Sequence, residues 1–181
     1  MCIRDSRPSD KPCLRWLGVN YVRGVTLASC EIAGHTIMVG CHVHGVIKIE
    51  SGSTLEMTGC TVVGTYPTGV RVGKQATLRA TDCDFRTPSD RRINQHVNAH
   101  LPGAKEVSLR SCRFFGDSHA DVALEIGSMQ TLVVEECTFE FQPSLDRWSS
   151  GKIDNGVALL RGVPPTISIR ANHFVDRSVF V

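Results

Sequence analysis

Two pairs of polar residues have a spacing that could support chemistry. His42 and His44 flank one valine, so in an extended segment both imidazoles would project from the same side, as a metal chelate requires. Asp117 and His119 lie on a Gly-Asp-Ser-His segment and could act as acid and base. No third ligand lies near the histidines in sequence, and turn chemistry alone accounts for the second pair. We therefore expect a solvent-facing histidine pair and an ordinary turn.

Asp82 and Asp84 supply the paired carboxylates that calcium sites and glycosidases use. In the repeat described below, Asp84 is expected to face Arg113, with Thr61 on its other side, and these neighbours do not suit a cation. The sequence thus assigns no catalytic residue and no metal ligand, and we expect no cofactor.

A further set of residues could bind a ligand from loops. Aromatic side chains stack on sugar faces, and arginines bind carboxylate or sulfate groups. The candidate ligand-binding residues are Tyr66, Arg91, Arg92, His96, Asp117, His119, Arg147 and Trp148. The alternative, that these are ordinary solvated loop residues, remains open.

The elements that would position these residues follow from a repeat of about 23 to 35 residues around a cysteine or its substitute. The residues five and three before this anchor and two after it are apolar. The anchors are Cys30, Cys60, Cys83, Cys112, Cys137 and Asn172. The residues two after them are Ile32, Val62, Phe85, Phe114, Phe139 and Phe174.

The parity of these positions predicts two short strands that meet at a corner. Residues five and three before the anchor share one face of a strand, and the anchor shares a face with the residue two after it, but the two pairs are one residue out of step. A third apolar run precedes them, as in Val70-Arg71-Val72. Three strands per repeat with no helical periodicity predict a parallel β-helix, with an antiparallel sandwich as the alternative.

The outward positions give independent support for the parallel β-helix, because equivalent residues of its successive coils should be neighbours. Opposite charges alternate there: Glu56 is expected beside Arg79, and Arg110, Glu135 and Arg170 follow in order. An antiparallel sandwich would not predict this complementarity.

Residues 25 to 178 resemble the right-handed parallel β-helix superfamily, the pectin-lyase-like fold, in stretches such as Gly45-Val46-Ile47-Lys48-Ile49. The resemblance implies an all-β, single-stranded right-handed parallel β-helix, a solenoid of about six coils of three short strands. Some members are pectate lyases or polygalacturonases, and many are not catalytic. Neither the calcium ligands and arginine of the lyases nor the aspartate trio of the hydrolases can be placed on this sequence.

The length variation between repeats falls on one edge, between the second strand and the third, and variable loops on a rigid scaffold commonly bind ligands. We therefore expect a non-enzymatic scaffold that binds a protein or carbohydrate along this edge. The alternative is a pectin-lyase-like polysaccharide lyase or glycoside hydrolase acting on an acidic glycan. A structural filament ranks last, because the outward ladders are charged.

The bulk composition bounds the partners. The chain has 181 residues, a formal net charge of +2 and no Lys/Arg block, so we expect neither nucleic-acid nor membrane binding, and the oligomeric state stays open. Stacked, reduced cysteines favour a reducing compartment such as the cytoplasm, although secretion stays open.

Residues 1–6 resemble the translation of a sequencing adapter, as found at the head of metagenomic reading frames, which would make the chain a fragment. We expect residues 7–24 to form an incomplete or irregular N-terminal coil and residues 25–181 to form the β-helix domain.

Overall fold

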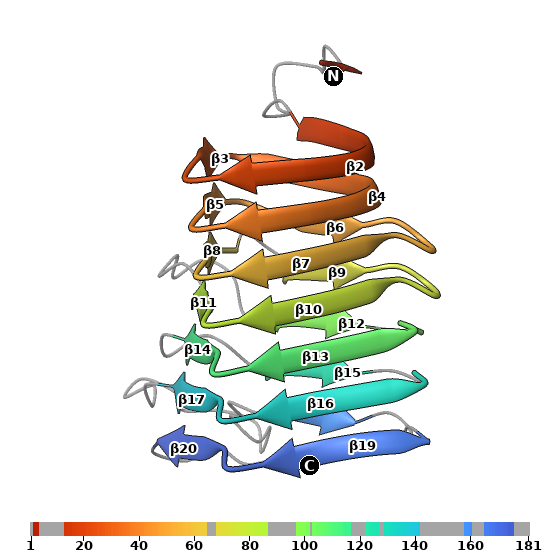
Figure 1. Cartoon of the computed structure of the whole chain (residues 1–181). Coiled ribbons are helices and arrows are strands. Elements are labelled where there is room, and N and C mark those ends of the chain that lie inside the picture. Colours follow the sequence, from red (N-terminus) through yellow and green to blue (C-terminus); the bar gives the residue numbers. More distant parts are fainter. Residues whose placement is uncertain are drawn as a thin grey trace, which may run out of the picture.

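The computed structural model describes residues 2–3, 13–64, 68–86, 97–101, 103–116, 122–126, 129–141, 158–160 and 165–175. Within these residues every regular element is a β-strand, and the strands stack in successive rows (Figure 1). Apart from the short antiparallel pair of β1 (Cys2–Ile3) with β2 (Cys13–Arg23), the pairings are parallel. The predicted all-β fold with parallel strands is confirmed.

We number the columns of strands by the order of the three strands in each repeat. The larger sheet contains the first and the third column, and the smaller sheet is the second. The first column consists of β7 (Thr54–Thr58), β10 (Thr77–Thr81), β13 (Glu106–Arg110), β16 (Thr131–Glu135) and β19 (Thr166–Arg170). The third column consists of β6 (Ile47–Ile49), β9 (Thr68–Val72), β12 (Val97–Leu101), β15 (Val122–Ile126) and β18 (Ala158–Leu160). The long strand β4 (Ser29–Val39) joins them, because its first half pairs with β6 and its second half with β7.

The second column forms a separate, smaller sheet. Its strands are β3 (Thr26–Leu27), β5 (His42–His44), β8 (Thr61–Val63), β11 (Asp84–Arg86), β14 (Arg113–Gly116), β17 (Thr138–Phe141) and β20 (His173–Val175). Each strand follows a first-column strand, or the long strand β2 or β4 in the case of β3 and β5, after a short corner, as the change of parity predicts. Because every row pairs in register with the next, equivalent residues form continuous columns.

The inward columns form the core. Phe85, Phe114, Phe139 and Phe174 stack with ring centroids 4.9, 5.0 and 5.1 Å apart and nearly parallel planes. The first three are at most 1% exposed. Offset or parallel contact between aromatic rings adds to the free energy gained by burying them. The predicted inward position of these phenylalanines is confirmed.

The prediction that Cys30 opens the anchor column is wrong. Cys30 pairs with Ile47 in the third column, whereas Cys41 precedes β5 and lies above Cys60. Val25 precedes β3 in the same way and lies above Cys41. The physical reason is that β4 runs through the bend without interruption, so apolar alternation in the sequence does not mark where one column ends and the next begins.

The third apolar runs are strands, as predicted, but their register differs from an alignment on the opening valines. Val70 pairs with Ile47 in the row before and with Ala99 in the row after. Val97 pairs instead with Thr68. The third-column strands begin at different positions relative to the rows beside them, so their opening valines do not all pair with one another.

Each corner places its last residue before the anchor in the left-handed region. These residues are Gly24, Gly40, Gly59, Asp82, Ser111, Glu136 and Ala171, with φ between 50° and 63°. Glycine adopts this conformation without strain, whereas the same conformation costs an L-residue with a Cβ about 1–2 kcal/mol. The corner therefore keeps the left-handed conformation even in the rows where the residue at this position is not glycine.

The anchor side chains hold the corners together from inside. Cys60 Sγ accepts a hydrogen bond from the Cys41 amide at 3.4 Å and lies 3.5 Å from the Met38 carbonyl oxygen. Asn172, at the C-terminal end of the anchor column, makes the equivalent two contacts. Its Oδ1 accepts a hydrogen bond from the Cys137 amide and its Nδ2 donates to the Val134 carbonyl, both at 2.9 Å. The anchor column thus satisfies buried backbone groups that the sheets leave unpaired.

We predict that Ala171→Gly stabilises the protein by about 0.5–1 kcal/mol, because it relieves the left-handed strain at a corner while raising the entropy of the unfolded chain. Ala33→Gly, on β4 outside the left-handed region, is the matched control and should destabilise by a similar amount. Chemical denaturation measures both, and a loss of stability in Ala171→Gly would contradict the strain.

We predict that Cys60→Ala destabilises by about 1–3 kcal/mol, since it leaves the buried Cys41 amide without its acceptor. Cys60→Asn should retain more of the stability, because an amide in this column can accept and donate as Asn172 does. The hydrogen bond with the Cys83 sulfur, together with burial, raises the pKa of Cys60, so the thiol remains a donor at neutral pH. Equal losses in the two variants, by denaturant unfolding, would reject the bridging role.

Candidate functional site

The ligand-binding residues predicted on the variable loops lie outside the described residues. This applies to Tyr66, Arg91, Arg92, His96, Asp117, His119, Arg147 and Trp148. The loop edge therefore stays a prediction, and the site that can be built from described side chains lies elsewhere.

The two predicted histidines project from β5 to solvent. His42 and His44 are exposed, while Val43 between them is fully buried. Their register neighbours in the next row are Thr61 and Val63. Among the described residues, no group of three or more histidine, cysteine, aspartate or glutamate side chains is arranged to hold a metal ion.

The carboxylates near the corner before β11 are separated by the geometry of that corner. Asp82 is exposed in the left-handed position, and Asp84 is half-buried. Asp84 lies in register with Arg113, as predicted, but it accepts a 2.7 Å hydrogen bond from Arg86. Arg113 instead donates to Glu140 at 2.6 Å, because its long side chain reaches along the neighbouring row. The predicted neighbours are confirmed, and the pairing of their charges differs.

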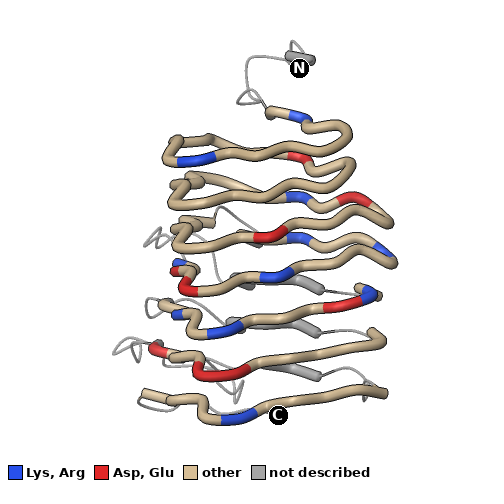
Figure 2. Tube along the Cα trace, viewed as in Figure 1, with Lys and Arg blue, Asp and Glu red and all other residues tan. Residues whose placement is uncertain are grey.

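Glu135 is the most buried carboxylate among the described residues, at 5% exposed. It lies between the arginines predicted to flank it: Arg110 Nη1 is 2.7 Å from Oε2 and Arg170 Nε is 2.8 Å from Oε1. The Ser168 hydroxyl also donates to Oε1 at 2.6 Å. Acidic and basic positions alternate from row to row along this column (Figure 2).

The partners of Glu135 make it a structural anion. The hydrogen bonds from Ser168 and Arg170, with the charge of Arg110, hold the pKa of this carboxyl below its ordinary value of 4.5. An ionised carboxylate has no proton to give, and both oxygens of Glu135 are already bonded to groups of the fold. We therefore assign Glu135 to the cohesion of the rows.

We predict that Glu135→Gln lowers the melting temperature at neutral pH. Because the folded pKa is depressed, the stabilisation is present above the unfolded pKa near 4.5 and is lost as the pH falls through the lower folded value. The gap in melting temperature between the two proteins should therefore narrow on acidification below pH 4.5. Glu136→Gln, at an exposed position bonded to Ser111, is the control and should change the melting temperature little. A gap that does not depend on pH would refute an electrostatic role.

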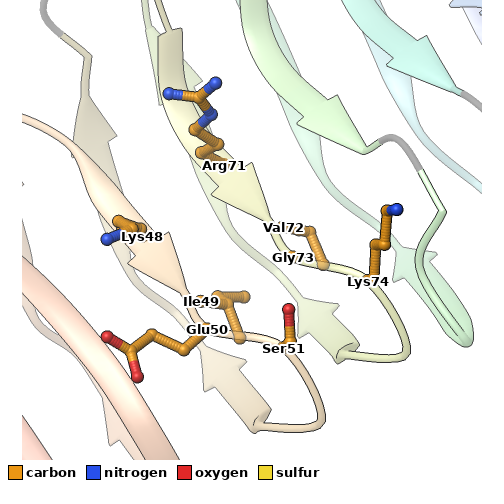
Figure 3. Close-up of a pocket in the computed structure, with 8 residues that line it drawn as sticks. All are labelled: Lys48, Ile49, Glu50, Ser51, Arg71, Val72, Gly73 and Lys74. Atoms are coloured by element: carbon orange, nitrogen blue, oxygen red, sulfur yellow. The ribbon is translucent and has the colours of Figure 1, made fainter.

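A hollow on the outer face of β6 and β9 gathers several charged side chains (Figure 3). It encloses about 520 Å³ and opens to solvent. It is lined by Lys48, Ile49, Glu50, Ser51, Arg71, Val72, Gly73 and Lys74. Strand alternation turns Ile49 and Val72 inward and leaves Lys48 and Arg71, which pair in register, on the outer face. Two cations on adjacent strands thus overlook the same hollow.

Neighbouring rows neutralise part of this charge. Lys48 Nζ donates to Glu31 at 2.8 Å, and Arg15 Nη2 donates to both Glu50 oxygens at 2.9 and 3.0 Å. In the part of the chain that the structure describes, neither Arg71 nor Lys74 has an ion-pair or hydrogen-bond partner for its side chain. Among the described residues the hollow therefore presents two positive charges without a carboxylate partner, which is an arrangement that binds an anion.

The floor of the hollow depends on Gly73. Its amide donates to the Ile49 carbonyl at 2.8 Å, and a Cβ at this position would come within 2.8 to 3.0 Å of Ser51 N, Ile49 O and Glu50 C. Only glycine lets the two turns approach so closely. The short contact fixes Ser51 and Lys74 on adjacent turns.

A second, smaller hollow continues along the same turn edge. It encloses about 400 Å³ and is lined by Lys74, Gln75, Gly103, Ala104, Met129 and Gln130. Because Lys74 lines both, the two hollows are neighbours along the stack of rows. This edge joins the third column to the first, and it is a different edge from the one that carries the variable loops.

Sequence reasoning missed this edge because its turns have nearly constant length, and variable loops drew attention to the other side. One signal was present: Lys48 and Arg71 occupy equivalent outward positions in consecutive repeats, and Lys74 lies on the turn three residues after Arg71. What the sequence did not reveal is which of these cations the acidic residues of other rows neutralise.

No helix among the described residues is long and apolar enough to cross a membrane. Three comparisons with known proteins, against family models, curated proteins and solved structures, each found no match.

Proposed function

We propose that this protein is a non-enzymatic scaffold that binds an acidic polysaccharide on the outer face of a right-handed parallel β-helix of about six three-stranded coils, of the pectin-lyase-like type. The repeated rows and the two parallel columns joined by β4 support the helical course of the chain. The resemblance to that superfamily supplies its handedness.

The observation that carries the binding proposal is the pair of cations at the first hollow, Arg71 and Lys74, to which no carboxylate of the described residues bonds. Arg71 supplies a planar guanidinium that can bind a carboxylate through two parallel hydrogen bonds, and Lys74 adds a second charge on the adjacent turn. The Ser51 hydroxyl lines the same hollow and can donate or accept. A uronic acid offers a carboxylate beside hydroxyl groups, which matches this set.

A rigid scaffold makes such weak contacts effective. Arg71 and Lys74 project from backbone that is tied by parallel pairing and by the Gly73 contact, so little backbone entropy is lost on binding. A polymer can contact several rows at once, and each bound unit raises the effective concentration of the next. The variable-loop edge is the second surface at which we propose that the scaffold binds a protein or carbohydrate.

We predict that Arg71→Ala/Lys74→Ala weakens binding of polygalacturonate by about 10- to 100-fold, the loss of two charge-assisted hydrogen bonds. Isothermal titration calorimetry on the full chain measures the affinity at two salt concentrations, and the wild-type affinity should fall at high salt. Arg23→Ala removes an exposed arginine outside the hollow and is the matched control, with binding unchanged.

The same samples are assayed for reducing and unsaturated ends. Release of either would contradict the non-enzymatic proposal and favour the alternative, a polysaccharide lyase or glycoside hydrolase acting on an acidic glycan. Binding that survives the double substitution would move the site from this hollow to another surface.

A further inference from the structure

The second hollow differs from the first in its chemistry. Its exposed polar groups are the side chains of Gln75 and Gln130, and neither amide has a hydrogen-bond partner in the described part of the chain. Its floor is apolar, formed by Ala104 at 1% and Met129 at 7% exposure. Lys74 is the one charged residue that lines it.

Free amides over an apolar floor suit a neutral sugar. An amide both donates and accepts, as does a sugar hydroxyl, so the two can pair in either direction. The C–H face of a pyranose ring is apolar and can pack on the polarisable methionine and the alanine methyl. A second carboxylate would find no further cation here beyond Lys74, so a charged unit gains less in this hollow than in the first.

The backbone holds the two glutamines at a fixed separation. The backbone N–H of Gln75 donates to the Gly103 carbonyl at 2.9 Å, and the backbone N–H of Gln130 donates to the Lys105 carbonyl at 3.1 Å. They therefore lie about two rows, or roughly 10 Å, apart along the stack.

Glycine between them keeps the hollow open. Gly103 has φ of 72°, where a side chain is strained, and a Cβ there would lie 3.5 Å from Lys74 Cγ. Because glycine has no side chain, the hollow over the middle row leaves space for a ligand between the two side-chain amides.

We propose that the two hollows bind consecutive units of one glycan in which a uronic acid alternates with a neutral sugar. The acidic unit lies at Arg71 and Lys74, the neutral unit lies between Gln75 and Gln130, and the glycan runs along the stack of rows. This inference rests on the proposed function and names the class of polysaccharide that the site takes.

The test compares three oligosaccharides of equal length by calorimetry with the full chain. They are an alternating glucuronate and N-acetylglucosamine hexamer, a homogeneous galacturonate hexamer and a neutral N-acetylglucosamine hexamer. Wild type should bind the alternating hexamer most tightly. Gln75→Ala/Gln130→Ala should weaken that binding roughly tenfold, by the loss of two neutral hydrogen bonds, and change galacturonate binding less than about twofold.

The outcomes separate this inference from the proposed function. Loss of both acidic ligands in Arg71→Ala/Lys74→Ala, with loss of selectivity alone in the glutamine variant, supports both. Galacturonate binding equal to or tighter than that of the alternating hexamer, or a glutamine variant that binds like wild type, overturns the second subsite and leaves the first. No binding of either acidic hexamer by wild type overturns both. Thermal melts confirm that each variant is folded, and Arg23→Ala again serves as the control.

Discussion

The left-handed corner before each anchor is the constraint on which the rest of the structure depends. It turns the chain between the first and second columns in one residue, so every row repeats the same path and pairs in register with the next. Glycine serves this position without strain in the early rows, as at Gly40 and Gly59, but Ser111, Glu136 and Ala171 adopt it in later ones. The parallel pairing of adjacent rows over-determines the geometry and pays for the strained residues.

Once the corner fixes the register, side chains of one type accumulate in columns. The phenylalanines stack at close to the strand spacing, and the anchor thiols satisfy amides and carbonyls that face the interior. On the outside, the same register brings Arg110 and Arg170 to opposite sides of Glu135. Cohesion between rows therefore comes from repeated short contacts in three environments: aromatic, thiol and ionic.

The register also produces the candidate site, because it leaves some of the described cations without a carboxylate partner in the neighbouring rows. Glu31 bonds to Lys48 and Glu50 bonds to Arg15, whereas no described carboxylate bonds to Arg71 in the next row. Among the described residues, no carboxylate bonds to Arg71 or Lys74, so these two cations keep a positive local field at the hollow. The turn edge adds the close backbone approach at Gly73, beside which the first hollow forms.

The sequence by itself determined the columns, because period-two alternation and a shared anchor survive in any row: the inward phenylalanines, the corner and the flanking of Glu135 were all readable. The tertiary structure alone decided that Cys41 rather than Cys30 begins the thiol column, since a strand that continues through a bend keeps its alternation. It also decided where the hollows lie. A cation is free only when no carboxylate of another row reaches it, and that depends on contacts between residues far apart in the chain.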